Sequence, residues 1–168
     1  SVDGGQYMWM GDLTPAPRSI ETQALDLTCG GTICFDIKFA VQGQASPCEG
    51  PDAVGEGVYL QYSTVSPTGP WTQIFYFDPA GGNDPVMTTW NNYCFQIPEA
   101  AQTATTYLSW AQTSTSGATF DHWGIDNVQV FTTCVPYFYV WQDGSNQEDT
   151  LVQPSDTTQY TEWYQKAE

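Results

Sequence analysis

Basic residues are almost absent from this chain of 168 residues: Lys and Arg total 3, against 19 Asp and Glu, and the formal net charge is -16. Nucleic acids and anionic membrane surfaces are bound through basic side chains, so we expect neither as a partner. Long apolar runs are absent as well, and no stretch approaches the roughly 20 residues of a membrane-spanning helix, so membrane insertion is not expected. The opening residues SVDGG contain neither a basic nor an apolar segment, and no signal peptide is expected there.

Leucine and helical periodicity are also scarce, whereas 15% of the residues are aromatic and the chain has 15 Gly and 11 Pro. Such a composition favours strands and turns over helices. Only 13% of the residues are charged, and the aromatic side chains can bury much apolar area, so the chain should fold rather than stay disordered. Its length suits one domain with a core of its own and part of a second.

Apolar and polar residues alternate along six segments, which is the pattern of strands that bury one face. Stretches rich in Pro, Gly and Ser separate them and indicate turns, and one helical turn is expected within residues 98–103. Several short strands joined by turns predict an all-β fold, namely a two-sheet antiparallel sandwich of the jelly-roll type. The six segments are residues 34–41, 57–65, 71–77, 93–97, 108–110 and 123–131. The side chains expected inside are Phe35, Ile37, Phe39, Leu60, Trp110 and Val128.

The alternating pattern breaks at residues 132–136. A fresh strand is expected over residues 137–141, followed by a polar stretch and further turn residues. The piece after the break is too short to form a domain by itself. The sequence therefore predicts a β jelly roll over residues 1–133, and a linker with the beginning of a second β-module over residues 134–168.

The five cysteines form no C-x-x-C pair, and with a single histidine in the chain a zinc-finger site is not expected. At least one disulfide, involving Cys48 or Cys34, fits the secreted type of composition, whereas buried free thiols are the alternative. Cys29 and Cys34 flank a Gly-Gly turn and could face each other, and Cys48 and Cys94 would then form a second pair. Cys134 would be left over, with a partner beyond the last residue.

Asp126 is the main candidate for a functional residue. If Val128 and Val130 face inward, the period of two turns Asp126 inward as well, and a carboxylate turned inward needs a partner. With only three basic residues in the chain, a cation is the expected partner, and calcium (Ca2+) suits carboxylate and carbonyl oxygens. The alternative is a turn in which Asp126 bonds its own backbone. Asp121 is expected to be a turn residue, with a role as a metal ligand as the alternative.

Two further groups of residues are interpreted as structural. The loop of residues 48–56 holds three carboxylates without the spacing of an EF-hand, and we expect a solvated acidic loop. Catalysis by a Ser/His/Asp set would depend on His122, which lies beside Trp123 on an expected strand. A packed histidine is the better interpretation, no G-x-S-x-G motif is present, and no enzyme is expected.

Tryptophan raises the question of sugar binding, because aromatic faces stack on pyranose rings. Three tryptophans have polar or Gly-rich neighbours and could be exposed: Trp9, Trp90 and Trp141. Three others fall within strand patterns and are expected in the core: Trp71, Trp110 and Trp123. An exposed, coplanar aromatic platform would favour a carbohydrate-binding module. Buried aromatic residues, with the two ends of the module far apart, would favour a spacer.

Six pieces of the chain, in this order, resemble a reelin-type subrepeat, which is a jelly-roll module. The resemblance spans roughly residues 7–131. It departs from the family in the loop at Cys48, which has one cysteine where such loops often have a pair. The pieces are RSIETQALDL (18–27), VYLQYS (58–63), GPWT (69–72), IPEAA (97–101), TTYLSWAQ (105–112) and DHWGIDNVQV (121–130).

The resemblance implies an extracellular, calcium-stabilised, non-catalytic module. In the resembling family, the aspartate at Asp126 joins acidic residues near the first strand, which runs antiparallel beside the last, and here these would be Asp3 or Asp12. The residues after Cys134 look like the start of the Ig-like or PKD-like modules that follow such domains in large bacterial surface proteins. Gliding-motility adhesins of the type IX secretion pathway are the suggested group.

From these observations we expect an adhesion or spacer module of a large secreted or cell-surface protein. Its partners would be neighbouring modules of the same polypeptide and a cell-surface glycan or protein. The alternative is a carbohydrate-binding module attached to a secreted hydrolase.

Overall fold

The computed structural model describes residues 1–11, 16–44, 49–82, 84–133, 137–141 and 162–166. The chain divides into two compact units, Ser1–Thr132 and Thr133–Glu168. The first unit contains eight described strands and one 3-10 turn, η1 (Glu99–Ala101), which confirms the helical turn expected there. The strands are β1 (Met8–Met10), β2 (Arg18–Glu21), β3 (Gly31–Phe39), β4 (Val58–Ser63), β5 (Thr72–Phe77), β6 (Asn91–Gln96), β7 (Tyr107–Gln112) and β8 (Trp123–Thr132).

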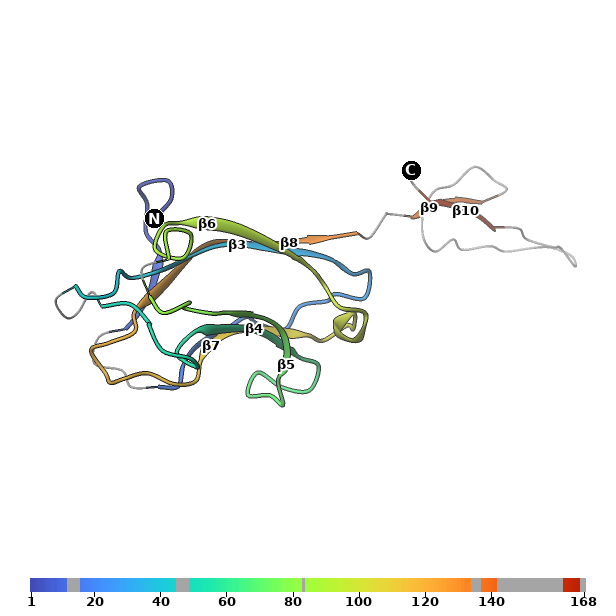
Figure 1. Cartoon of the computed structure of the whole chain (residues 1–168). Coiled ribbons are helices and arrows are strands. Elements are labelled where there is room, and N and C mark those ends of the chain that lie inside the picture. Colours follow the sequence, from blue (N-terminus) through green and yellow to red (C-terminus); the bar gives the residue numbers. More distant parts are fainter. Residues whose placement is uncertain (12–15, 45–48, 83, 134–136, 142–161, 167–168) are drawn as a thin grey trace, which may run out of the picture. The chain divides into compact units, whose positions relative to one another are not determined.

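The strands of the first unit form two four-stranded antiparallel sheets, which lie as two layers in Figure 1. Sheet A has the order β1-β8-β3-β6, and sheet B has the order β2-β7-β4-β5. Along each sheet the chain repeatedly skips to a strand that is distant in sequence, as Greek-key sandwiches do. The prediction of an all-β, two-sheet antiparallel sandwich is confirmed.

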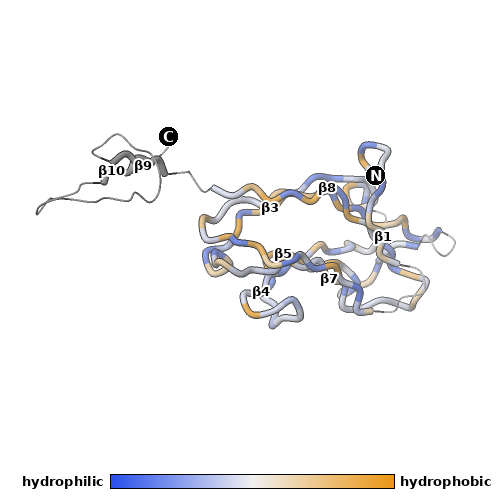
Figure 2. Tube along the Cα trace, turned by 180° about the vertical axis from the view of Figure 1, so that it is seen from behind, coloured by the Kyte–Doolittle hydropathy of each residue, from blue (hydrophilic) through white to orange (hydrophobic). Residues whose placement is uncertain are grey.

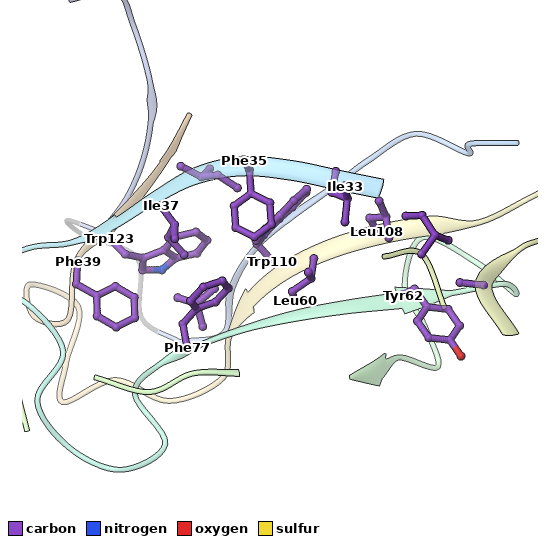
Figure 3. Close-up of a cluster of buried hydrophobic side chains, with 14 of the residues drawn as sticks. Ile33, Phe35, Ile37, Phe39, Leu60, Tyr62, Phe77, Leu108, Trp110 and Trp123 are labelled. Atoms are coloured by element: carbon purple, nitrogen blue, oxygen red, sulfur yellow. The ribbon is translucent and has the colours of Figure 1, made fainter. Parts of the chain in front are cut away.

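The core lies between the two sheets and consists mainly of the inward-facing residues of β3, β4 and β7. Along β3, hydrophobic and hydrophilic residues alternate (Figure 2), because successive side chains of a strand point to opposite faces. Figure 3 shows the side chains of this core pointing toward one another between the layers. Five residues predicted to lie inside are buried as expected: Phe35, Ile37, Phe39, Leu60 and Trp110.

Val128 was also expected inside, and this prediction is wrong, because 42% of the residue is exposed. The ladder between β3 and β8 is irregular: Asp36 pairs with Asp126, but Cys34 pairs with Gln129, so β8 has one residue more than β3 over this stretch. Such a β-bulge reverses the alternation of a strand. Val130, beyond the bulge, packs against the core, whereas Val128 lies in the bulge itself.

The two ends of the first unit lie far apart. Strand β1 pairs antiparallel with the beginning of β8, where Met8 lies opposite Ile125, which confirms that the first strand runs beside the last. Strand β8 then runs the length of sheet A and ends where Thr132 lies opposite Gly31. In Figure 1 the N-terminus accordingly lies at one end of the sandwich, and β8 leaves at the other.

Sheet A contains the disulfide between Cys34 on β3 and Cys94 on β6, two residues that lie directly opposite each other. The expectation of a disulfide involving Cys34 is therefore confirmed. The pairings of Cys29 with Cys34 and of Cys48 with Cys94 are wrong, because Cys34 and Cys94 bond each other. Cys29 is itself disulfide-bonded. Cys48 and Cys134 lie outside the described residues.

The second unit contains the described strands β9 (Tyr137–Trp141) and β10 (Glu162–Lys166), which pair antiparallel. The strand expected over residues 137–141 is confirmed. That this unit begins an Ig-like or PKD-like module stays a prediction. Within the part of the chain that the structure describes, no helix is long and apolar enough to cross a membrane.

Candidate metal centre

Three carboxylate groups meet at one end of the sandwich, where the loop before β4 approaches the loop before β8. They belong to Asp52, Glu56 and Asp121, and one oxygen of each lies within 4.8 Å of the others. Only 2% of Asp121 and 6% of Glu56 is exposed, and Asp52 is half-buried. We call these three residues the acidic triad. Buried carboxylates this close repel one another unless a proton or a cation lies between them.

Gln112, at the end of β7, joins the two loops that carry the triad. Its fully buried amide nitrogen donates to the backbone carbonyl oxygens of Glu56, at 2.7 Å, and of Asp121, at 2.9 Å. Residues 56 and 121 are far apart in the sequence, and this amide holds their backbones close together. The triad is therefore positioned by a strand end rather than by the loops alone.

Arg18, on β2, holds the loop that carries Asp121. The guanidinium is buried and donates to Gln112 Oε1 at 3.2 Å. Burial lowers the pKa of Arg18, and the negative charge of Asp121 opposes that change. Its other hydrogen bonds go to the carbonyl oxygens of Gly117, Ala118, Phe120 and Asp121. Arg18 thus fixes the backbone of the loop and supplies a positive charge close to the triad.

Glu56 also organises its own loop. Its Oε2 accepts hydrogen bonds from the backbone N–H groups of Asp52, at 3.2 Å, and Ala53, at 2.9 Å. Its Oε1 accepts a hydrogen bond of 2.6 Å from the hydroxyl of Ser116. The carboxylate of Asp121 accepts the backbone N–H of the same Ser116, and Asp121 has a left-handed φ of 62°. Asp121 is thus a turn residue, as expected, and part of the triad as well.

The pKa values of the two buried carboxyl groups of the triad are shifted in opposite directions. Burial raises the pKa of Asp121 to about 6, opposed by the N–H of Ser116 and reinforced by the nearby charge of Glu56. Burial also acts to raise the pKa of Glu56, but hydrogen bonds from Ser116, Ala53 and Asp52 outweigh it, and the pKa is lowered. Without a cation and below about pH 6, a proton shared within the cluster therefore resides on Asp121.

A further oxygen lies next to Asp52. The side-chain nitrogen of Gln42 donates to Asp52 Oδ2 at 2.8 Å and to Glu49 Oε1 at 3.1 Å. The carbonyl oxygen of the same amide, Gln42 Oε1, is buried and has no hydrogen-bond donor among the described residues. Carboxylate and amide oxygens are the ligands that hard divalent cations prefer, so the chemistry of this end of the sandwich fits such an ion.

The structure places Asp126 differently from the sequence argument. Because the bulge follows it, Asp126 pairs with Asp36 on the outer face of sheet A and is half-buried. Its Oδ1 accepts the N–H of Asn127 at 2.9 Å, which is the local bond of the alternative interpretation, and its Oδ2 accepts the N–H of Val2 at 3.1 Å. The second bond brings the N-terminal segment to Asp126.

Asp3 lies in that N-terminal segment, directly after Val2. It is exposed, and its Oδ1 accepts the N–H of Gly5 at 2.9 Å. Asp12, the other acidic residue expected near Asp126, lies outside the described residues. A role of these residues as calcium ligands stays a prediction.

The other candidate residues pack as structural side chains. His122 is fully buried, and its ring lies 5.4 Å from that of Trp9 at an angle of 88°. Trp110 and Trp123 belong to the core, as predicted, whereas Trp71 is half-buried. The ring of Tyr7 meets those of Trp9 and Trp90 edge to face, at 82° and 79°. Trp9 is exposed and Trp90 is half-buried, but this cluster presents no coplanar platform for a sugar ring.

The sequence analysis does not predict the acidic triad. Residues 48–56 were interpreted as a solvated acidic loop, and for Glu56 this is wrong, because it is buried. Two signals in the sequence point toward the triad: Asp121, for which a metal role is the alternative, and Arg18, one of three basic residues in the chain, which lies at the start of a strand.

Comparison with known proteins agrees with the fold and with the resemblance drawn from the sequence. Residues 1–130 match the family described as Reelin subrepeat B. No curated protein matches the chain with significance. The match covers more than half of the chain and coincides with the described sandwich, and reelin subrepeats are structural modules of extracellular proteins. The chain belongs to the reelin subrepeat B family.

Proposed function

We propose that the first unit is a non-catalytic adhesion or spacer module of a larger extracellular or cell-surface protein, and that calcium bound at the acidic triad stabilises it. The observation that carries this proposal is the close approach of three carboxylates, two of them buried, at the end of a sandwich that belongs to an extracellular family. Neighbouring modules of the same polypeptide are its first partners.

Calcium suits the triad for three reasons. It accepts several carboxylate and carbonyl oxygens in a flexible geometry, which matches ligands from two separate loops. It takes the place of the proton that Asp121 holds only below about pH 6, and so relieves the repulsion within the triad. It also joins the loop before β4 to the loop before β8, so that bound calcium would oppose separation of the two loops.

The spacer role is supported by the path of the chain. The N-terminus and the end of β8 lie at opposite ends of the sandwich (Figure 1), so a chain of such units would extend rather than fold back. The depth of Glu56 and Asp121 argues against catalysis, because a substrate would not reach two carboxylates that are almost completely buried. The edge-to-face aromatic cluster makes a carbohydrate-binding module the weaker proposal.

Asp126 with Asp3 and Asp12 remains the second proposed ligand set. The hydrogen bond from Val2 to Asp126 supports it, because this bond brings the N-terminal segment to β8. The triad is preferred, since Glu56 and Asp121 are almost fully buried, whereas Asp126 is half-buried.

Thermal unfolding tests the proposal. Calcium chloride should raise the melting temperature of the wild-type protein well above the effect of sodium chloride at the same ionic strength. A ligand that binds only the folded state at a hundredfold excess over Kd contributes about 2.7 kcal/mol. Equal effects of the two salts would contradict the proposal, because screening of the -16 charge would then explain the whole response.

A further inference from the structure

Four aromatic side chains close one open side of the sandwich. They come from β5 and β6, which are edge strands of sheets B and A among the described strands. The rings of Phe75 and Phe95 lie 4.9 Å apart, and those of Phe77 and Tyr93 lie 5.1 Å apart, so each pair joins the two sheets. We call these four residues the aromatic seam.

The seam forms one wall of a groove of about 370 Å³. Phe75, Phe77 and Tyr93 line it, together with Val86 and Met87 from the loop that precedes β6. Phe75 is 40% exposed and Val86 is 53% exposed, so apolar surface is open to solvent on both sides of the groove. An apolar groove of this kind suits the apolar part of a bound side chain.

Two carboxylates line the same groove, those of Asp78 and Asp84. Asp78 Oδ1 accepts the N–H of Ala80 at 2.9 Å, and Asp84 Oδ1 accepts the N–H of Val86 at 2.8 Å. Each carboxylate is therefore fixed beside the groove by one oxygen. Burial raises the pKa of Tyr93, and the negative charge of Asp84 adds to this increase, which shows that the carboxylate acts on the seam.

Aromatic faces with carboxylates beside them are suited to a cation on an apolar stem. A guanidinium or ammonium group is attracted to the face of an aromatic ring, and a guanidinium can also donate two hydrogen bonds to a carboxylate. An acidic segment would be repelled, because the chain has a formal net charge of -16. The rings of the two pairs are inclined at 39° and 74°, so they offer no flat platform to a sugar.

We propose that this groove binds an arginine-bearing basic segment of a partner protein, with the guanidinium between the aromatic seam and the carboxylates of Asp78 and Asp84. The proposal deepens the adhesion role proposed above and rests on it, because it names the chemistry of the partner surface. It does not involve the acidic triad, which lies in other loops.

The test uses a blocked tri-arginine peptide as the probe, with a blocked tri-glutamate peptide as its control. Binding is followed by NMR through the ring resonances of Phe75 and Tyr93 at constant ionic strength. Tri-arginine should shift these resonances in a saturable manner, and tri-glutamate should not. The absence of a saturable shift would overturn the proposal.

Matched variants separate a site from general attraction by the acidic chain. Asp78→Asn/Asp84→Asn preserves the turn-forming side-chain oxygens and should weaken binding at least about threefold. Phe75→Leu should weaken it to a similar degree. Glu21→Gln/Glu99→Gln removes the same charge from exposed positions outside the groove and should change the affinity less than about twofold. Equal weakening by both charge pairs would overturn the proposal.

The calcium response of each variant is measured in parallel and should stay unchanged. Loss of peptide binding with an intact calcium response would locate the failure in the groove alone. A missing calcium response in the wild-type protein would instead count against the proposed function, whatever the peptide does.

Discussion

Two groups of acidic residues in this module differ in how their carboxylates are satisfied. On the outer face of sheet A, both oxygens of Asp126 accept backbone N–H groups, and Asp36 accepts the side-chain amide of Asn127 at 2.8 Å. In the acidic triad, Asp121 has the N–H of Ser116 on one side and the carboxyl group of Glu56 on the other. Asp126 is thus balanced by hydrogen-bond donors, as is Glu56 within the triad, whereas we infer that Asp121 is balanced by a proton or a cation.

We infer from this difference that depth and hydrogen-bond donors, rather than the number of acidic residues, decide which carboxylates of an acidic protein a cation would stabilise. Asp121 is almost fully buried, which penalises its charged form and raises its pKa to about 6. Asp126 is only half-buried and has a donor for each oxygen.

Arg18→Met should cause the largest loss. It removes the hydrogen bonds to the loop of residues 117–121 and the positive charge closest to the triad. Removal of one partner from a buried charged network costs about 3–5 kcal/mol. Urea denaturation without calcium gives this free energy of unfolding.

Lys38→Met is the control for Arg18→Met, because it removes the same charge from a half-buried position on β3. We expect a change within about 1 kcal/mol, since exposed charges contribute little. Similar losses in the two variants would show that Arg18 acts only through the net charge.

Cys34→Ala/Cys94→Ala should lower the free energy of unfolding by about 2–4 kcal/mol, because a crosslink over 60 residues is removed. The bond belongs to β3, the strand that carries Asp36, and not to the loops of the triad. The rise in melting temperature with calcium should therefore persist in this variant. If the rise disappears with the disulfide, the calcium site belongs to sheet A.

The pH dependence of stability follows from Asp121. Its pKa is higher in the folded state than its ordinary value of 3.8, so the folded state holds this proton more tightly. Stability from this group is present below pH 4 and is lost as the pH rises toward and through 6. Between pH 5 and 7.5, without calcium, the free energy of unfolding should fall by about 1–2 kcal/mol.

Asp121→Asn should flatten that profile, because no proton is then released at residue 121. Glu56 contributes with the opposite sign and at lower pH, since its pKa is lowered in the folded state. Urea denaturation at the two pH values measures the difference. An unchanged slope in Asp121→Asn would assign the pH dependence to another group.

Asp126→Asn should have the smallest effect, within about 1 kcal/mol without calcium. The side-chain oxygen of Asn can still accept one of the two N–H groups, those of Val2 and Asn127. A loss of unfolding free energy as large as that of Arg18→Met would show that the carboxylate of Asp126 compensates a buried charge.

Most of the fold could be predicted because alternation is a local property. All six expected segments appear as strands, and the buried residues of β3 follow the period of two. The two short strands β1 and β2 were not found by periodicity, because three or four residues hold too little of a pattern.

The bulge and the triad could not be predicted, for related reasons. The extra residue at Asn127–Val128 can be recognised only from the pairing of β8 with β3. In the sequence alone, the period of two continues from Val130 through Val128 to Asp126. The triad depends on Gln112, which joins the carbonyls of Glu56 and Asp121 across the fold. These hydrogen bonds join residues that are distant in the sequence, so no local sequence pattern predicts them.

Calorimetric titration with calcium tests the central claim most directly, in the wild-type protein and in Asp121→Asn and Asp126→Asn. Both substitutions remove one negative charge and preserve size, so they differ only in which group they disturb. We predict one calcium bound by the wild-type protein and by Asp126→Asn, and an affinity at least about tenfold weaker in Asp121→Asn. Loss of binding in Asp126→Asn alone, or equal binding by all three proteins, would contradict the assignment of calcium to the acidic triad.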